Sequence, residues 1–404
     1  MSASVVYHGF GIRGYQYERT YYEDGAVTFV IRQARERLRC PRCNSPHIER
    51  RGGVTRMFRL VPIGRKPVQA VLDIARVFCP RCQITRQVKV EFADENRRYA
   101  RNFERYVLEL SRNMTIDAVA QHLQIHWNTV KEIQKRHLER HYSRPKLKHL
   151  KEIAIDEISI GRGNKFLTVV MDLRSGAVVF VGKGRGSEAL LPFWKRLSAS
   201  QAKIRAVAID MSRAYTAAVR GHLPNAVLVY DHFHIIKLFN EKLTDLRRDL
   251  HRQAVEGLHK DVLKGIRWLL LKNPENLDPK KRERERLDEA LELNAPLFVA
   301  YYMKEQLRQL WSQPNKRTAR QFLNGWIRLA GMTGILILMN FAKTLAAHRE
   351  GILAWYNYPI STGPLEGTNN KIKTMKRQAY GFRDHEFFIL KIMAIHEATY
   401  ALVG

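Results

Sequence analysis

The four cysteines of this chain form two copies of one motif, and their spacing constrains the N-terminal fold more than any other feature. Each copy reads Cys-Pro-Arg-Cys, at Cys40–Cys43 and at Cys79–Cys82, and the 404-residue sequence contains no other cysteine. Two Cys-x-x-Cys pairs are the usual ligands of a structural zinc ion in a closed tetrahedral site. The segment between them has the pattern of strands and turns. We therefore predict a small Zn²⁺-binding ribbon within residues 1–95, with Cys40, Cys43, Cys79 and Cys82 as ligands.

Three other uses of four cysteines compete with zinc. Disulfides are rare in cytosolic proteins, and the sequence start has no basic, then apolar, secretory pattern. A thioredoxin-like redox pair would need a βαβ context, which is absent from the pattern. An iron–sulfur cluster also uses four thiolates, but nothing else in the sequence indicates electron transfer.

The charge of the chain indicates a polyanionic partner. Lys and Arg number 69 against 39 acids, a net charge of +30, and residues 1–150 hold 29 of these cations and 14 of the acids. Such an excess favours double-stranded DNA, with an anionic membrane surface as the weaker alternative. Because no apolar run is long enough to cross a bilayer, we expect no membrane association and a cytoplasmic, nucleoid-associated protein of bacterial type.

The segment after the zinc module has the pattern of a helix-turn-helix. Thr115 can cap a short helix, a turn follows at Gln124–His126, and a second, basic helix begins near Asn128. In this motif the second helix enters the major groove of DNA. We assign residues 96–148 to this domain, although an ordinary helical hairpin with solvated charges would look similar. The candidate DNA contacts are His126, Trp127, Asn128, Thr129 and Lys131.

The second half of the chain alternates strands and helices in an order that predicts a ribonuclease-H-like core. Three strands, the last two a hairpin, precede two apolar strands separated by helices, so an antiparallel front continues into parallel strands. Asp156 lies within the first strand, and Asp210 ends the fourth. Two carboxylates that face each other at a sheet edge need a cation between them, and oxygen ligands suit Mg²⁺ or Mn²⁺. The core spans residues 149–250 and 351–404, around an all-α insertion at 251–350.

Asp231 ends the next apolar strand and is followed by two histidines. The motif reads "YDHFHIIK", so His232 and His234 flank it closely. These residues are auxiliary candidates, as a metal pair or as DNA contacts. Asp210 and Asp231 could each instead cap the helix that follows, and for Asp231 this alternative is as strong as the functional one.

A final motif, "STGPLEGTNNKIKTMKRQAYGF" at 361–382, places Glu366 before a run of amides and cations. Together with "AIDEISI", "AVAIDMSRAY" and "VYDHFHIIK", and with the cysteine and helix-turn-helix patterns, it resembles transposases of the ISL3 family over nearly the whole chain. The resemblance implies a DDE transposase whose triad is Asp156, Asp210 and Glu366. The long separation of Asp210 from Glu366 fits family members with a helical insertion.

The resemblance also implies an activity and further contacts. Such an enzyme binds the terminal inverted repeats of its insertion sequence, cleaves the DNA strands and joins them to target DNA, with two metal ions held by the triad. Asp156 would bridge the ions, and Asn370 would orient Glu366 from one turn away. A homodimer is expected in the active complex. A non-catalytic DNA-binding regulator and a structure-selective nuclease of ribonuclease-H-like fold are the alternatives. Candidate contacts to the cut strand are Asn369, Asn370, Lys371, Lys373, Lys376 and Arg377.

Overall fold

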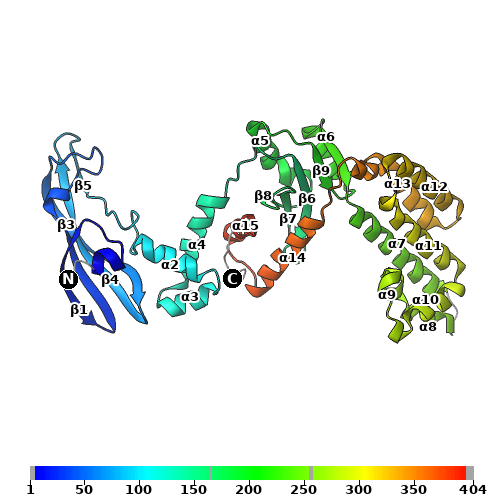
Figure 1. The fold of residues 1–404 in the computed structure, drawn as a ribbon, viewed down its shortest axis with the longest axis horizontal. Coiled ribbons are helices and arrows are strands. Elements are labelled where there is room, and N and C mark those ends of the chain that lie inside the picture. Colours follow the sequence, from blue (N-terminus) through cyan, green and yellow to red (C-terminus); the bar gives the residue numbers. More distant parts are fainter. Residues whose placement is uncertain (1–4, 164, 254–257, 397–404) are drawn as a thin grey trace. The chain divides into compact units, whose positions relative to one another are not determined.

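The computed structural model describes residues 5–163, 165–253 and 258–396 (Figure 1). It divides into two compact units. The first unit contains the chain up to Ser143 and the segment Thr374–Lys391. The second contains Arg144–Lys373 and Ile392–His396. The parts of the predicted segments that fall on 1–4, 164, 254–257 and 397–404 lie outside the described residues. Within the described ranges, no helix is long and apolar enough to span a bilayer.

A five-stranded sheet forms the N-terminal part of the first unit. Its order is β1-β2-β4-β3, with β5 paired to the end of β4. The hairpin of β3 and β4 turns at Gly64, whose φ of 59° favours glycine. Its apolar core includes Ile31, Phe58 and Leu72. The elements are η1 (Val5–Gly9), β1 (Tyr15–Glu23), β2 (Ala26–Gln33), η2 (Arg35–Arg37), β3 (Glu49–Ile63), β4 (Lys66–Cys79) and β5 (Ile84–Gln87).

Three helices with a separate apolar core follow: α2 (Arg101–Leu110), α3 (Ile116–Leu123) and α4 (Trp127–Tyr142). The Thr115 hydroxyl accepts the Ala118 N–H and starts α3, as predicted. Gln124 then takes a left-handed conformation with φ 52°, and the His126 ring caps α4 through the Asn128 N–H. The two short helices and the tight turn have the arrangement of a helix-turn-helix. Their core consists of Phe103, Val107, Val119, Ala120, Leu123, Val130 and Ile133.

The sheet of the second unit has the order β10-β9-β6-β7-β8. Strands β6, β7 and β8 pair antiparallel, and β9 and β10 continue the sheet parallel to β6. The succession of strands and helices therefore matches the prediction. The elements are β6 (Glu152–Ser159), β7 (Phe166–Asp172), β8 (Val178–Lys183), η3 (Ser187–Leu190), α5 (Leu191–Ser200), β9 (Ala206–Ile209), α6 (Arg213–His222), β10 (Val227–Tyr230) and α7 (His232–Gln253).

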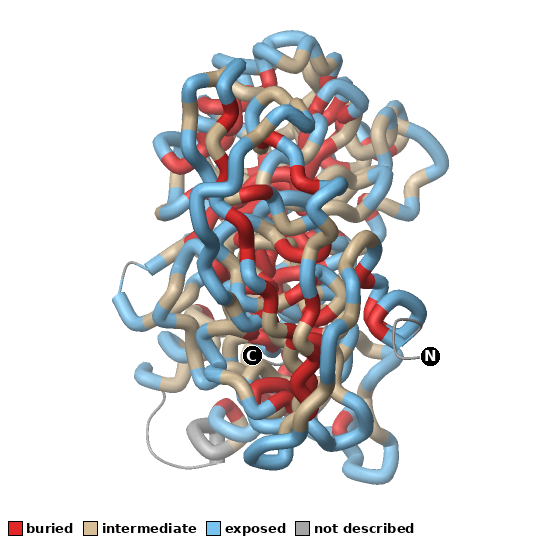
Figure 2. The backbone as a smooth tube through the Cα atoms, turned by 90° about the vertical axis from the view of Figure 1, so that its left-hand side faces the viewer, coloured by how far each residue is buried: buried red, intermediate tan, exposed pale blue. Residues whose placement is uncertain are grey.

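The mostly helical residues 232–353 share one apolar core with this sheet. This core includes Val207 in the sheet and Phe239 and Leu345 in the helices. Figure 2 shows the buried stretches alternating with exposed ones along the chain. Helix α13 lies against β10, where a Cβ on Gly351 would come within 2.4 Å of the Tyr230 ring. The remaining elements are α8 (Leu258–Gly265), α9 (Arg267–Leu271), η4 (Pro274–Asn276), η5 (Pro279–Lys281), α10 (Glu283–Glu292), α11 (Ala295–Arg308), η6 (Gln309–Ser312), α12 (Lys316–Met332), α13 (Leu336–Leu353), η7 (Ala354–Tyr356), α14 (Gly363–Gln378) and α15 (His385–Met393).

Candidate active site and cysteine cluster

The four cysteines lie together, with their sulfur atoms within 4.8 Å of one another. Both motifs fold into the same turn. The Asn44 N–H donates to the Cys40 carbonyl and the Gln83 N–H to the Cys79 carbonyl, each over 2.9 Å. Asn44 and Gln83 are both left-handed, with φ of 59° and 52°. The repeated sequence has therefore produced a repeated loop, and the two loops face each other.

The geometry of this cluster fits a zinc ion. Sulfur atoms about 2.3 Å from a tetrahedral Zn²⁺ lie about 3.8 Å apart, and the Cys43 and Cys79 sulfurs are separated by 3.6 Å. A hydrogen bond from the Cys43 backbone N–H lowers the pKa of the Cys40 thiol to about 6, whereas contact with Cys43 and the other thiols raises the pKa of Cys82 to about 12. Cys40 and Cys79 are buried and Cys43 and Cys82 are half-buried, so the cluster is partly shielded from water.

Three aspartates lie at one level across adjacent strands of the second unit. In the parallel pair β6 and β9, Ala154 stands beside Ala208, so the same register brings Asp156 to the level of Asp210. In β9 and β10, Ile209 stands beside Tyr230, which brings Asp210 to the level of Asp231. The carboxyl ends of parallel strands are where sites form in α/β sheets. Asp156 and Asp210, predicted to face each other, thus occupy equivalent positions on neighbouring strands.

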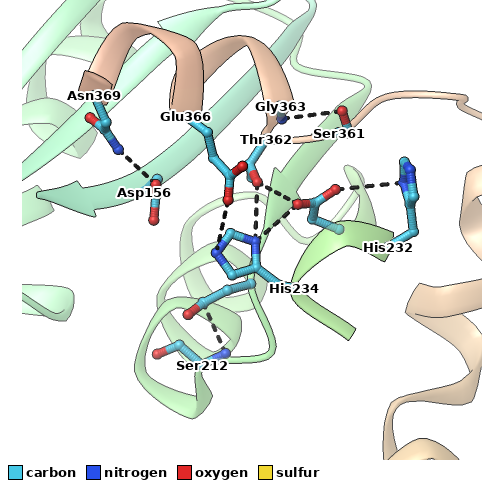
Figure 3. Close-up of polar contacts among 11 residues, drawn as sticks. Asp156, Ser212, His232, His234, Ser361, Thr362, Gly363, Glu366 and Asn369 are labelled. Carbon is cyan, nitrogen blue, oxygen red and sulfur yellow. Dashed lines mark hydrogen bonds and ion pairs between the residues drawn. The ribbon is translucent and has the colours of Figure 1, made fainter. Parts of the chain in front are cut away.

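The third acid, Glu366, lies in the first turn of helix α14. The pKa of Asp156 is raised to about 6, first by burial and then by the carboxylates of Asp210 and Glu366. The Glu157 backbone N–H and His234 oppose this rise. The Asn369 side-chain amide, one turn further along α14, donates to Asp156 Oδ2 over 2.8 Å (Figure 3). Three acids from distant parts of the sequence therefore interact electrostatically.

A network of hydrogen bonds and one ion-pair contact joins Asp231 to Glu366. Asp231, with 1% of its surface exposed, accepts at Oδ2 from Thr362 Oγ1 over 2.7 Å and from His234 Nδ1 over 2.9 Å. The other ring nitrogen, His234 Nε2, lies 3.6 Å from Glu366 Oε1. Figure 3 marks this contact with a dashed line. Burial alone would raise the pKa of Asp231, but the His234 and Thr362 hydrogen bonds lower it overall. The same bond to Asp231 raises the pKa of His234.

Neither aspartate caps the helix that follows it through its side chain. Asp210 Oδ1 accepts the Ser212 N–H over 3.0 Å, but Ser212 is itself the N-cap of α6 and that helix has no side-chain cap bond. Asp231 Oδ1 has no hydrogen-bond partner among the described residues, and Oδ2 is occupied by Thr362 and His234. Asp231 is therefore part of the network and does not cap α7. His232 Nδ1 lies 3.6 Å from Asp231 Oδ1.

Two contacts differ from the sequence-based expectations. Asn370, expected to orient Glu366, is exposed, and it is Asn369 that reaches the site, at Asp156. Thr362 was absent from the predictions, although its side chain is fully buried and ties Asp231 to the start of α14. No local pattern marks this residue, since its partner lies 131 positions away.

The candidate DNA contacts on α4 differ in accessibility. His126, Trp127 and Asn128 are exposed, and Thr129 is half-buried. Lys131 is half-buried too, and its Nζ lies 3.3 Å from Asp384 Oδ2, so a partner within the same unit already holds it. On α14, the exposed candidates are Asn370, Lys371, Lys373 and Arg377, whereas Lys376 is half-buried and Asn369 is buried.

Comparison with known proteins adds independent findings. A family model described as a transposase, of the ISL3 type, matches residues 153–392, and a model of the helix-turn-helix domain of transposase family ISL3 matches residues 88–138.

The chain is similar to the transposase for insertion sequence element IS1001 of Bordetella parapertussis, at 32% identity over 95% of this chain and 96% of the relative. It is 30% identical to the transposase for IS1557 of Mycobacterium tuberculosis, over 92% of this chain and 88% of the relative. A solved Drosophila P element transposase strand transfer complex matches with a TM-score of 0.40 and 9% identity, over 73% of this chain and 91% of that chain.

Proposed function

Because this chain belongs to the ISL3 family of transposases and carries that family's helix-turn-helix DNA-binding domain, we propose that it cuts and joins the ends of its own insertion sequence. It binds the terminal inverted repeats and catalyses metal-dependent strand cleavage and strand transfer. One observation carries the proposal: Asp156 and Asp210 lie at one level of the sheet, and Glu366 interacts electrostatically with Asp156. The strand order, with its antiparallel front and parallel continuation, supports a ribonuclease-H-like core.

The donor set suits magnesium or manganese. Three interacting carboxylates, one of them with its pKa raised to about 6, are electrostatically unfavourable without a cation. Asp156 would bridge two ions, and Asp210 and Glu366 would each hold one. When bound, the ions activate a water or a 3′-hydroxyl and stabilise the leaving oxygen of the phosphodiester.

The residues of α14 position both the acids and the DNA. Asn369 holds Asp156 through its amide, so the carboxylate keeps its orientation before any ligand arrives. The exposed cations Lys371 and Lys373 follow Glu366 on the same helix and contact the backbone of the strand being cut. This arrangement requires no covalent bond between protein and DNA.

The N-terminal modules select the DNA. The zinc ribbon and the helix-turn-helix carry half of the net positive charge of the chain, which supplies the affinity for phosphates. Two ends must be brought together for transfer, so the active complex is a homodimer on DNA, at the nucleoid in the bacterial cytoplasm. The interacting acids favour this enzyme over a non-catalytic regulator, which would need only the N-terminal modules.

The proposal is tested with a labelled duplex that carries one end of the element. With Mg²⁺ or Mn²⁺ the full-length protein is expected to nick the DNA at the end of the repeat and to join it to a second duplex. Glu366→Gln is expected to bind this duplex with unchanged affinity and to leave it intact. A wild-type protein that neither nicks nor joins would refute catalysis, and equal cutting of branched DNA without repeat ends would favour the structure-selective nuclease.

Asn128 is expected to read the DNA sequence. It is exposed in the first turn of α4, the part of a second helix that contacts base edges. Asn128→Ala should lower the preference for repeat ends over random DNA by about 1–3 kcal/mol, with little change in non-specific affinity. Competition binding by fluorescence anisotropy measures both. In the matched variant Lys131→Ala, the preference should persist, because Lys131 is paired with Asp384; loss of preference in this variant alone would contradict the assignment.

A further inference from the structure

The imidazole of His234 faces a different partner with each nitrogen. Nδ1 lies 2.9 Å from Asp231 Oδ2, and Nε2 lies 3.6 Å from Glu366 Oε1. Asp231 belongs to the strand end of β10 and Glu366 to the first turn of α14, while His234 lies in the first turn of α7. These three side chains form a group whose ligand atoms all lie within 4.8 Å of one another. Figure 3 shows the His234 ring beside Glu366 and Thr362.

The contacts of Asp231 determine which nitrogen carries the proton. Its carboxylate is buried, and as an ionised group it can only accept hydrogen bonds. Thr362 Oγ1 donates to Oδ2 over 2.7 Å, and His234 Nδ1 must donate to the same oxygen. In the neutral ring, Nε2 then carries a lone pair and no proton.

This lone pair points toward another electron-rich atom. Nε2 and Glu366 Oε1 are 3.6 Å apart, so a positive charge is favoured there: either a proton on Nε2, which makes the contact an ion pair, or a cation bound in its place. A histidine that donates one N–H to a buried carboxylate and offers the other nitrogen outward is a recurring arrangement around protein-bound metals. Thr362 strengthens it, because it fixes Asp231 from the residue just before α14.

We propose that His234 is a nitrogen ligand to the divalent cation held by Glu366, and that Asp231 and Thr362 keep its ring in the metal-binding tautomer. This inference rests on the proposed function, because it places His234 at the same cation site as the acids. It assigns one coordination position to nitrogen in a site otherwise made of oxygen. Imidazole nitrogen suits transition-metal ions better than it suits Mg²⁺. The site should therefore prefer Mn²⁺ over Mg²⁺ more strongly than three carboxylates alone would.

Pulsed electron paramagnetic resonance of bound Mn²⁺ tests this directly. Full-length protein with zinc at the cysteines is mixed with half an equivalent of Mn²⁺, and the echo modulation is recorded. Wild type is expected to show ¹⁴N coupling from a directly bound imidazole, which changes to a ¹⁵N pattern after labelling of histidine. His234→Gln should lose the coupling. His222→Gln, which removes an exposed histidine of the same unit, should retain it.

A second variant keeps the imidazole in place. Asp231→Asn preserves the shape of the side chain but removes the ionised acceptor, so the tautomer is no longer fixed. We expect the ¹⁴N coupling to weaken or vanish and Mn²⁺ affinity to fall about 10- to 100-fold. A thermal melt of each variant verifies folding.

The outcomes separate this inference from the proposed function. Mn²⁺ that is bound and sensitive to Asp156→Asn, without ¹⁴N coupling in wild type, overturns the ligand role of His234 and leaves the proposed function standing. Coupling that survives in His234→Gln also overturns it. If Mn²⁺ binding does not respond to Asp156→Asn or Glu366→Gln, the proposed cation site itself fails.

Discussion

Asp156→Asn is expected to abolish strand cleavage and, at the same time, to stabilise the metal-free protein. The catalytic loss should be about 10³-fold or more, because the substitution removes the charge expected to bridge the two ions. The stability gain follows from the pKa of Asp156, which burial and the neighbouring acids raise from 3.8 to about 6. A rise of about two units corresponds to about 3 kcal/mol that the ionised carboxylate costs the folded state at neutral pH.

The sign of the pH dependence follows from proton uptake. Between the unfolded pKa near 3.8 and the folded pKa near 6, the folded protein holds more protons at Asp156 than the unfolded chain does. The contribution of Asp156 to stability therefore falls as the pH rises through this window, and the loss is complete near pH 7. Asp156→Asn should lack this component.

Differential scanning fluorimetry from pH 4 to 7.5 measures the effect, in magnesium-free buffer that leaves the zinc in place. The matched control is Glu188→Gln, an exposed acid of the same unit, which should change neither cleavage nor melting temperature. An Asp156→Asn protein that melts below wild type at pH 7, or that still cuts repeat ends, would contradict the expected cost and role of this carboxylate.

The sequence predicted those parts of the site that depend on short patterns. Apolar runs that end in Asp210 and Asp231 were recognisable as buried strands, and the observed register brings both to the level of Asp156. The cysteine motifs were equally informative, since two identical loops came together at one point. In each case a local rule, strand periodicity or ligand spacing, decides the outcome before tertiary packing does.

Such local rules do not predict contacts between distant segments of the chain. Helical spacing placed Asn370 on the face of Glu366, but docking of α14 buries Leu365, Thr368 and Asn369, so the neighbouring amide reaches Asp156. The partner of Lys131 is Asp384, which lies 253 positions away and belongs to the same unit. Which side chain makes such a long-range contact depends on how the helices and strands pack against one another.

Removal of the zinc predicted at the four cysteines is expected to disorder the cysteine loops and abolish DNA-end recognition. The two cysteine loops adjoin the ends of β3, β4 and β5, so a metal ion bound by their sulfur atoms would hold both loops against the sheet. Zinc binding to small four-ligand modules contributes about 10–16 kcal/mol in isolated peptides. The sheet also has its own apolar core, which includes Leu60 and Val68, so the loss should be local and not global.

Cys79→Ser is the sharpest form of this experiment, because Cys79 is fully buried and its sulfur lies 3.6 Å from that of Cys43. Native mass spectrometry should find one zinc per wild-type chain and none in the variant, and affinity for repeat ends should fall about 100-fold or more. The control Arg81→Ala alters an exposed residue of the same loop and should keep its zinc.

The helices α2 to α4 have a separate core and should stay folded, so proteolysis of the variant should cut before Phe103 and spare these helices. Zinc retained by Cys79→Ser would contradict a structural zinc site at these cysteines. Iron in place of zinc in the wild-type protein would also contradict it and would favour the iron–sulfur cluster.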